Sequence, residues 1–216
     1  MKLLKHLAVA ALLGAGLAHA ANPAPVLDKE YKIINPAIPT DAPGKVEVLE
    51  FFQYTCGHCY DFEPFVKTWK AKKPKDVVWR YVPTVWDASR IPQAKIFYTL
   101  EAMGLLDQLH DKVYDAIHQK GLLLTERAVL SKWIAAQPGV DAKKFEETYD
   151  SFGVDNKVQR ATQMTKTYLI KGTPTVIVNG KYSTGPGNAI NASGRVDYER
   201  FGQILDDLVA MEQKKK

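Results

Sequence analysis

The sequence is poor in the side chains that bind metal ions. Its 216 residues include only two cysteines, Cys56 and Cys59, and five histidines. A structural zinc site needs four ligands, which usually come as two pairs of Cys or His. Because the chain has no third cysteine, we expect no metal site, and the cysteine pair needs another explanation.

The sequence also lacks a long apolar run. Its strongest apolar stretch, residues 7–17, is shorter than the roughly 20 residues of a membrane-spanning helix. The stretch follows two lysines and precedes Ala18-His19-Ala20, which is the pattern of a secretory signal with an A-x-A cleavage site. We predict that residues 1–20 are a cleaved signal peptide. The mature chain then begins near Ala21, outside the cytoplasm, where disulfides persist.

A strong excess of one charge is absent as well. The formal net charge of +5 includes two lysines of the leader and the three terminal lysines, residues 214–216. The rest of the chain is near neutral, so we expect no nucleic-acid partner. With 46% apolar and 25% charged residues, the composition is that of a globular protein that can bury a core.

The first half of the mature chain predicts a strand, a helix and a second strand. Residues 46–52 are almost all apolar, as in a strand that is covered on both faces. A helix is expected over residues 57–72, broken or bent at Pro64, because a proline ring does not fit an unbroken helix interior. Residues 77–82 predict the second strand.

Helical periodicity dominates residues 92–171. Thr125 and Asp141 are the expected N-caps within this segment, because their side chains can accept hydrogen bonds from free backbone amides. No internal repeat divides the segment. We interpret it as a helical insertion into an α/β domain.

Sheet character returns near the C-terminus. Residues 175–178 predict a strand, and Asn179-Gly180 is a strong signal for a tight hairpin turn. An amphipathic helix is expected over residues 197–211. The chain therefore closes as a hairpin followed by a helix.

The cysteine pair is placed for redox chemistry. Positions i and i+3 on the first turn of a helix face the same side, close enough for a disulfide. Cys56 is expected at the helix N-terminus, where free amides and the helix dipole favour a thiolate, and a protonated His58 would favour it further. Cys59 is expected one turn deeper and less accessible. This asymmetry provides an attacking sulfur and a resolving sulfur, as thiol–disulfide exchange requires.

Two other interpretations of the pair are weaker. A disulfide between Cys56 and Cys59 closes a very small loop, so it restricts the unfolded chain far less than a long-range bridge. A zinc site lacks ligands, since the histidines after the leader are His58, His110 and His118, and we expect the last two to be exposed or to line a helix contact. We therefore favour a redox-active pair.

Two segments resemble the DsbA family of periplasmic thiol–disulfide oxidoreductases of Gram-negative bacteria. They are VLEFFQYTCGHCYDFE, residues 48–63, and GTPTVIVNGKY, residues 172–182. The resemblance implies a thioredoxin fold with an inserted all-helical domain. The thioredoxin-like parts would then span residues 21–87 and 169–216, with the insertion at 88–168.

The same resemblance assigns roles to residues outside the helix. It implies that the Thr173–Pro174 peptide bond is cis, faces the cysteines and binds substrate. Glu50, Glu63 and Arg80 match positions that tune the cysteines: Glu50 would relay a proton from the buried sulfur, and Arg80 would balance its charge. Alternatively, Glu50 and Arg80 reach solvent at strand ends, or form a buried ion pair without a catalytic role.

The chain departs from the family pattern between its cysteines. Enteric members carry Pro-His there, whereas this sequence has Gly57-His58, the dipeptide of eukaryotic protein disulfide isomerase. Gly57 frees the loop, which could weaken the oxidising power or permit isomerase activity. The reaction type stays the same.

The resemblance implies a periplasmic enzyme that donates the Cys56–Cys59 disulfide to newly exported proteins with free thiols. It also implies reoxidation by a DsbB-like, quinone-linked membrane oxidase. We expect a monomer without any cofactor besides the disulfide. The alternatives are a disulfide isomerase or reductase and, from another class, a non-catalytic secreted module that binds peptides or acts as a chaperone.

Overall fold

The computed structural model describes residues 23–214. The predicted signal peptide and the last two lysines therefore lie outside the described residues. The described part contains a mixed sheet with the strand order β1-β5-β4-β2-β3. Its strands are β1 Lys32–Ile33, β2 Val46–Phe52, β3 Val77–Pro83, β4 Thr175–Val178 and β5 Tyr182–Thr184.

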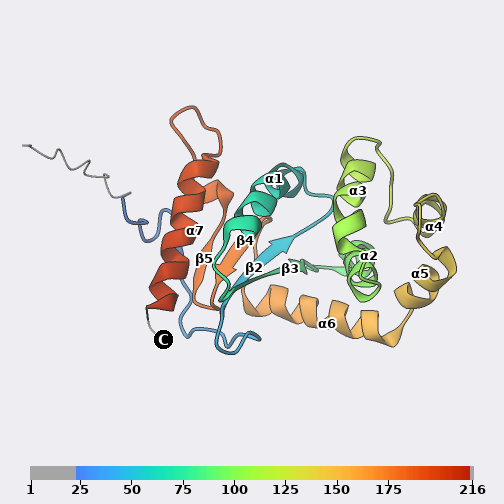
Figure 1. Cartoon of the computed structure of the whole chain (residues 1–216), viewed down its shortest axis with the longest axis horizontal. Coiled ribbons are helices and arrows are strands. Elements are labelled where there is room, and N and C mark those ends of the chain that lie inside the picture. Colours follow the sequence, from blue (N-terminus) through green and yellow to red (C-terminus); the bar gives the residue numbers. More distant parts are fainter. Residues whose placement is uncertain (1–22, 215–216) are drawn as a thin grey trace, which may run out of the picture.

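Strand β2 is the buried strand of this sheet. It pairs in parallel with β3 and antiparallel with β4. All seven of its residues are buried, Glu47 and Glu50 included. This burial explains why the other five residues are apolar, and it confirms the predicted strand. Helices α1 (Gly57–Lys72) and α7 (Tyr198–Gln213) cover one face, and α6 (Phe152–Thr167) runs along the other (Figure 1). Side chains alternate between the two faces, so Val48 packs in one core and Leu49 in the other.

Helix α1 runs without interruption through Pro64. Of the break or bend expected there, the break is wrong, and a bend stays a prediction. Phe62 and Val66, on either side of the proline, are fully buried in the core beneath α7. The ring of Phe62 packs edge-on against Phe201 of α7, with the ring centroids 5.5 Å apart. Tertiary packing therefore offsets the hydrogen bond that a proline removes from a helix interior.

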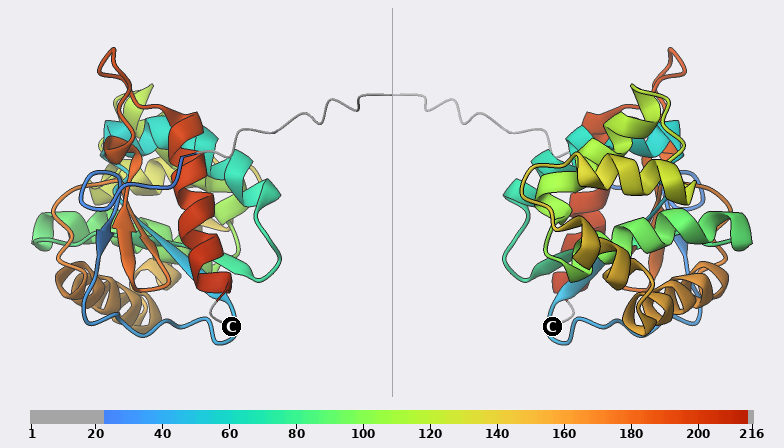
Figure 2. Two further views of the ribbon diagram at one scale, coloured as in Figure 1. Left: turned by 90° about the vertical axis from the view of Figure 1, so that its left-hand side faces the viewer. Right: turned by 90° about the vertical axis from the view of Figure 1, so that its right-hand side faces the viewer.

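A block of helices separates β3 from β4 in the chain. It contains α2 Ile91–Ala102, α3 Leu106–His118, α4 Arg127–Ala135, α5 Ala142–Tyr149 and α6. Figure 1 shows α2 to α5 gathered at the end of the molecule far from α7, and the right-hand view of Figure 2 looks onto these helices. Together with the sheet, they form a thioredoxin fold with a helical insertion.

Of the two expected N-caps, one is confirmed. Asp141 caps α5, since its side chain accepts a hydrogen bond of 2.9 Å from the amide of Lys144. Thr125 does not cap a helix. The amide of Glu126 bonds the carbonyl of Leu123, so Thr125 lies within a turn that precedes α4.

The predicted hairpin is also confirmed. Asn179 and Gly180 both have positive φ, 51° and 65°, and the amide of Lys181 bonds the carbonyl of Val178 at 3.0 Å. Such a turn matches the twist of the strands that it joins. A Cβ atom on Gly180 would lie 1.9 Å from the carbonyl oxygen of Ile38, so this position needs glycine for space as well as for conformation.

The final helix is confirmed as α7, with Asp197 as its N-cap. No helix within residues 23–214 is long and apolar enough to cross a membrane.

Candidate active site

The two cysteines occupy the first turn of α1. Cys56 is the N-cap, with an extended backbone (φ −90°, ψ 115°), and its carbonyl accepts hydrogen bonds from the amides of Cys59 and Tyr60, both at 3.1 Å. Both cysteines are free thiols, so the structure describes the reduced pair. Cys56 is half-buried, whereas Cys59 is 0% exposed. A partner thiol approaching from solvent therefore reaches Cys56 first.

The surroundings of Cys56 favour its thiolate. A hydrogen bond from the Cys59 thiol is the largest of the effects that lower the pKa of Cys56 to about 5. Partial burial opposes this shift, while the Thr173 hydroxyl and the amides of Cys59 and His58 add to it. At neutral pH the accessible sulfur is thus the nucleophile of the pair.

The side chain of His58 is exposed. The contribution to Cys56 that the structure shows comes from the backbone N–H of His58 and not from its imidazole. An effect of a protonated imidazole therefore stays a prediction. Gly57, the first residue of α1, has no atom within 4 Å of a Cβ built on it.

Thr173 and Pro174 lie beside the cysteines, although they are far away in the sequence. Their peptide bond is cis, as the resemblance implied. The carbonyl oxygen of Thr173 lies 3.4 Å from Cys56 Sγ and accepts a hydrogen bond from the thiol. The thiolate instead accepts a hydrogen bond from the Thr173 hydroxyl. Thr173 therefore interacts with both the thiol and the thiolate of Cys56. A role in substrate binding stays a prediction.

The environment of Cys59 has the opposite effect. Burial is the largest cause of its strongly raised pKa, followed by the hydrogen bond to Cys56 and the negative charge of Glu50. A buried thiolate is costly, so Cys59 must gain a proton when a disulfide to it opens. The structure thus separates an accessible, ionised sulfur from a buried, protonated one.

Glu50 is a buried acid beneath the pair. Glu50 is 0% exposed, and neither of its carboxyl oxygens has a hydrogen-bond partner within residues 23–214. Burial raises the pKa of Glu50 well above its usual range, and the nearby negative charge of Glu63 raises it further, against the cation of Lys70. Glu50 therefore neither reaches solvent nor belongs to an ion pair among the described residues, so both alternatives from the sequence are wrong for Glu50.

The structure contradicts the expected pairing of Arg80 with Glu50. Arg80 lies opposite Leu49 in the register of β2 and β3, whereas Glu50 lies opposite Tyr81. Successive side chains of a strand point to opposite faces, so the two charges are separated by the sheet. Arg80 instead pairs with Glu47, at 3.4 Å between Nη1 and Oε1, and its side chain is 43% exposed. The cation on the Glu50 side is Lys70.

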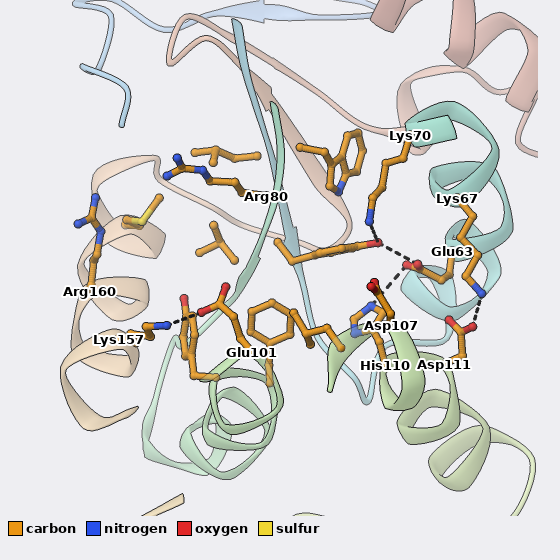
Figure 3. Close-up of a pocket in the computed structure, with 18 of the residues that line it drawn as sticks. Glu63, Lys67, Lys70, Arg80, Glu101, Asp107, His110, Asp111, Lys157 and Arg160 are labelled. Carbon is orange, nitrogen blue, oxygen red and sulfur yellow. Dashed lines mark hydrogen bonds and ion pairs between the residues drawn. The ribbon is translucent and has the colours of Figure 1, made fainter. Parts of the chain in front are cut away.

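Glu63, one turn after Cys59, lies in a buried hydrogen-bond network. Its Oε1 accepts a bond of 2.9 Å from the Tyr81 hydroxyl, and its Oε2 lies 3.6 Å from His110 Nε2. His110 Nδ1 in turn bonds the Tyr54 hydroxyl at 2.8 Å. Figure 3 shows Glu63 and His110 side by side at one end of a pocket, with Lys70 above them.

Sequence reasoning missed Tyr81, His110 and Lys70 as neighbours of the site. His110 does line a helix contact, as expected, but it is only 6% exposed and faces Glu63. One signal for Lys70 was available, because it follows Glu63 by seven positions and so shares its helix face. Tyr81 became a neighbour only through the pairing of β3 with β2.

Within residues 23–214, no group of three or more His, Cys, Asp or Glu side chains is arranged to hold a metal ion. The hydrogen bonds and charges of the site converge on the two sulfurs and on the acids beneath them. This arrangement can exchange electrons between thiols and disulfides by way of Cys56.

Comparisons with known proteins agree with this chemistry. The family of DSBA-like thioredoxin domains matches residues 82–201. The thiol:disulfide interchange protein DsbA of Burkholderia cepacia is 40% identical over 217 aligned residues, which cover 100% of this chain and 99% of the relative. The protein of the same name from Bordetella parapertussis is 42% identical over 186 residues, 86% of each chain.

Solved structures give the same result. The crystal structure of Pseudomonas aeruginosa DsbA superposes with a TM-score of 0.80 at 34% identity, covering 88% of this chain and 95% of that one. Reduced DsbA1 from Neisseria meningitidis superposes with a TM-score of 0.76 at 30% identity, covering 90% of this chain and 100% of that one. The likeness therefore includes the cysteine pair, which precedes the segment matched by the family.

Proposed function

Since this chain belongs to the DsbA family of thioredoxin-like proteins, we propose that it is a thiol:disulfide oxidoreductase that donates the Cys56–Cys59 disulfide to other proteins. The observation that carries this proposal is the difference between the two sulfurs. Cys56 is accessible and has a pKa of about 5, whereas Cys59 is fully buried and has a raised pKa. A thiol with a low pKa is a good leaving group, so a disulfide to Cys56 is readily broken.

The reaction begins when a substrate thiolate attacks Cys56 Sγ of the oxidised enzyme. A mixed disulfide forms, the Cys56–Cys59 bond breaks, and the electron pair of that bond stays on Cys59. A second thiolate of the substrate then attacks the substrate sulfur of the mixed disulfide. The substrate leaves with its own disulfide, and Cys56 leaves as the stabilised thiolate.

Thr173 and Pro174 provide the surface beside the attacked sulfur. The Thr173 carbonyl lies 3.4 Å from Cys56, and backbone groups in such a position can pair with an extended substrate strand. We propose that this pairing holds an unfolded chain while its thiol reacts. The substrates would then be unfolded or newly exported proteins with free thiols.

The compartment and the electron acceptor are parts of the same proposal. A leader with a basic start, an apolar stretch and an A-x-A site supports export and cleavage near residue 20, and a periplasmic location gives the disulfide an oxidising environment. A quinone-linked membrane oxidase of the DsbB kind would regenerate the disulfide. The protein would act as a monomer, with no cofactor besides its own cysteines.

The division of labour between the cysteines gives a direct test. The Cys56→Ser variant should not oxidise a reduced, unfolded protein substrate. The Cys59→Ser variant, mixed with a substrate that carries a disulfide, should accumulate mixed disulfides through Cys56, because a substrate thiolate leaves when Cys56 attacks and the resolving thiol is missing. The oxidised substrate and the mixed disulfides can both be quantified by mass spectrometry after acid quenching.

Other outcomes would point elsewhere. Mixed disulfides that form with Cys56→Ser, through Cys59, would reverse the assignment of the two sulfurs. Faster repair of a scrambled disulfide substrate than oxidation of a reduced one would favour an isomerase. If neither the wild-type protein nor either serine variant oxidises the substrate, the protein would be a peptide-binding module without redox chemistry.

A further inference from the structure

Strand β3 is an edge of the sheet, because β2 is its one neighbour within residues 23–214. The ladder between the two strands is fixed at both ends. At one end, the amide of Val46 bonds the carbonyl of Asp76 at 2.9 Å. At the other, the amide of Thr84 bonds the carbonyl of Phe52 at 2.8 Å. Backbone groups of successive residues point to alternate sides of a strand. The even-numbered residues of β3 therefore bond β2, and the odd-numbered residues direct their N–H and C=O groups away from the sheet.

The open part of this outer edge is short. At its start, the carbonyl of Val77 accepts a bond of 2.6 Å from Lys73 Nζ, and the Val77 amide bonds a carbonyl of the preceding turn. At its end, Pro83 has no N–H. In between, no hydrogen bond from another residue of the range 23–214 reaches the backbone groups of Trp79 and Tyr81. Two free N–H and two free C=O groups in a row form a template for another strand.

The open edge lines a pocket of about 720 Å³. Residues 79–82 of β3 contribute to it, together with side chains of α1, α2, α3 and α6. In Figure 3, Lys70 lies on one side of β3, and Arg80 and Arg160 lie on the other. A pocket of this volume is large enough for a ligand, and a strand advances only about 3.3 Å per residue. A short extended segment therefore has room beside β3.

The flank of the pocket on the α1 side holds unused hydrogen-bond donors. Trp79 is 8% exposed, and its indole N–H has no acceptor within residues 23–214. Lys70 lies over the ring of Tyr81, with Nζ 4.7 Å from the centroid and 3.4 Å from the hydroxyl, and it forms no ion pair within the same residues. A buried donor without a partner is costly, and a hydrogen bond from a charged donor is a strong one. This flank therefore favours a carboxylate.

The flank on the α6 side is apolar next to the strand. Leu49, Val82 and Met164 line the pocket there. All three belong to the core on the α6 face of the sheet or pack against it. Side chains of an added strand alternate between the two faces. A fitting segment therefore carries carboxylates toward Lys70 and apolar side chains toward Met164.

We propose that this edge is a second docking site for the proteins that Cys56 oxidises. An extended segment of such a protein pairs, as an added strand, with the backbone groups of Trp79 and Tyr81, while a Glu or Asp side chain of the segment binds Lys70. Main-chain pairing suits an enzyme that acts on many unfolded chains, because it depends little on their sequence. The identity of the partner rests on the proposed function, whereas the pairing itself needs no thiol.

The position of the edge separates it from the surface beside Thr173. Thr173 precedes β4, which lies on the other side of β2 from β3. Both sites nevertheless lie at the end of the sheet where α1 begins, since Pro83 of β3 pairs with Phe52 and α1 starts at Gly57. One unfolded chain thus has two places to bind while its thiol reacts at Cys56.

Amide hydrogen exchange of the full-length protein, resolved by NMR, tests the open edge before any partner is added. The amides of Arg80 and Val82 bond β2 and should exchange slowly. Those of Trp79 and Tyr81 should exchange at least about tenfold faster, because no acceptor holds them. Equal protection of all four amides would overturn the proposal, since the edge would then already have a partner.

The docking itself is tested with a capped peptide of alternating Glu and Val, which contains no cysteine. At about ten times its Kd, the peptide should slow the exchange of the Trp79 and Tyr81 amides by about tenfold. A matched peptide of alternating Lys and Val should bind at least about tenfold more weakly. The absence of added protection, or protection confined to residues 173–175, would contradict docking at β3.

N-methylated forms of the same peptide distinguish main-chain pairing from charge attraction alone. All Glu amides of such a strand point to one edge and all Val amides to the other. Methylation of one set should therefore weaken binding at least about tenfold, and methylation of the other set by less than about twofold. The sensitive set is that of Glu if the peptide runs antiparallel to β3, and that of Val if it runs parallel. Equal losses from the two sets would exclude an added strand.

The carboxylate contact is tested with Lys70→Met, which should weaken binding of the Glu peptide by about tenfold. Lys72→Met is the matched control, because Lys72 is also a basic residue in the last turn of α1 but does not line the pocket. Equal affinities of the two variants would overturn the proposal. Cys56→Ser should bind the peptide like the wild-type protein although it oxidises no substrate, so a failure of docking and a failure of the proposed function are distinguishable.

Discussion

The sulfur of Cys56 lies 3.4 Å from the carbonyl oxygen of Thr173, a residue 117 positions later in the chain. The contact joins the N-terminus of α1 to the loop before β4, so the two sequence segments that carry the family likeness meet at the reacting atom. The Thr173 hydroxyl adds a second interaction, because it donates to the Cys56 thiolate. The chemistry of the thiol therefore depends on a loop on the far side of the helical insertion.

We expect Thr173→Val to raise the pKa of Cys56 from its value of about 5. The substitution keeps the carbonyl contact and the shape of the side chain but removes the donor to the thiolate, and the loss of one such bond changes a pKa by about 1 unit. Ultraviolet absorbance of the thiolate measures the change. Thr175→Val is the control, because the Thr175 hydroxyl bonds the carbonyl of Gly172 instead. Equal pKa values in both variants would show that the hydroxyl has no effect.

The free energy of unfolding should depend on pH differently in the two redox forms. The folded pKa of Cys56 is about 5, below the unfolded value of about 8.5. A lowered folded pKa stabilises the reduced protein fully above the unfolded pKa and loses this effect as pH falls through the folded value. From about pH 5 to pH 7, the reduced form should gain about 2 kcal/mol relative to the oxidised form, after allowance for solvent screening at a half-buried sulfur.

The disulfide opposes this gain by about 2 kcal/mol, since it closes a loop of only four residues. The two forms should therefore be of similar stability at neutral pH, and the reduced form should be the less stable below pH 5. Denaturant midpoints of both forms at several pH values measure the difference. A stability difference that stays constant with pH would mean that the Cys56 thiolate is not stabilised by the fold.

Gly57→Pro should be tolerated and slightly stabilising. Position 57 is the first residue of α1, where proline is favoured, and Cys56 before it is already extended (φ −90°, ψ 115°). A Cβ at position 57 meets no atom within 4 Å, and the Gly57 amide is not among the donors to the Cys56 sulfur. We expect about 0.5 kcal/mol of added stability in both redox forms from the stiffer unfolded chain, with the pKa of Cys56 unchanged. A thermal melt that shows destabilisation would contradict this.

Gly180→Ala should destabilise the fold by at least about 3 kcal/mol, through left-handed strain and a collision with the Ile38 carbonyl. The added Cβ would lie 1.9 Å from that oxygen. Gly194→Ala is the matched control, because Gly194 also has a positive φ, 77°, but no atom within 4 Å of the added carbon. It should lose only about 1 kcal/mol. Equal losses in urea unfolding would mean that the segment around Ile38 moves aside.

Elements with a strong local signal were predictable from the sequence. The buried strand β2, the turn at Asn179-Gly180 and the cap at Asp141 follow from hydrophobic pattern, turn residues and side-chain acceptors. The errors arose where tertiary packing prevailed over a local rule. Pro64 does not break α1, because the helix is packed on both sides of it.

The redox pair itself was also predictable. Two cysteines at i and i+3 at a helix start, in a chain with no other thiol, define which sulfur attacks and which one resolves. Glu50 stood out as a charge within an apolar strand. The neighbours of Glu50 could not be inferred from the sequence. Arg80 is the charged residue of the neighbouring strand, but Tyr81 is the residue that lies opposite Glu50. Arg80 precedes Tyr81 by one position, so its side chain points to the other face of the sheet.

The sequence alone thus determined the reaction type, through the number and spacing of its cysteines, and it determined the elements that carry them. Only the tertiary structure decided which groups surround the sulfurs. The strand register placed Tyr81 beside Glu50, and the helical insertion brought His110 to Glu63. A pKa depends on the charges and burial within a few ångströms, and these distances arise from contacts between residues that are far apart in the chain.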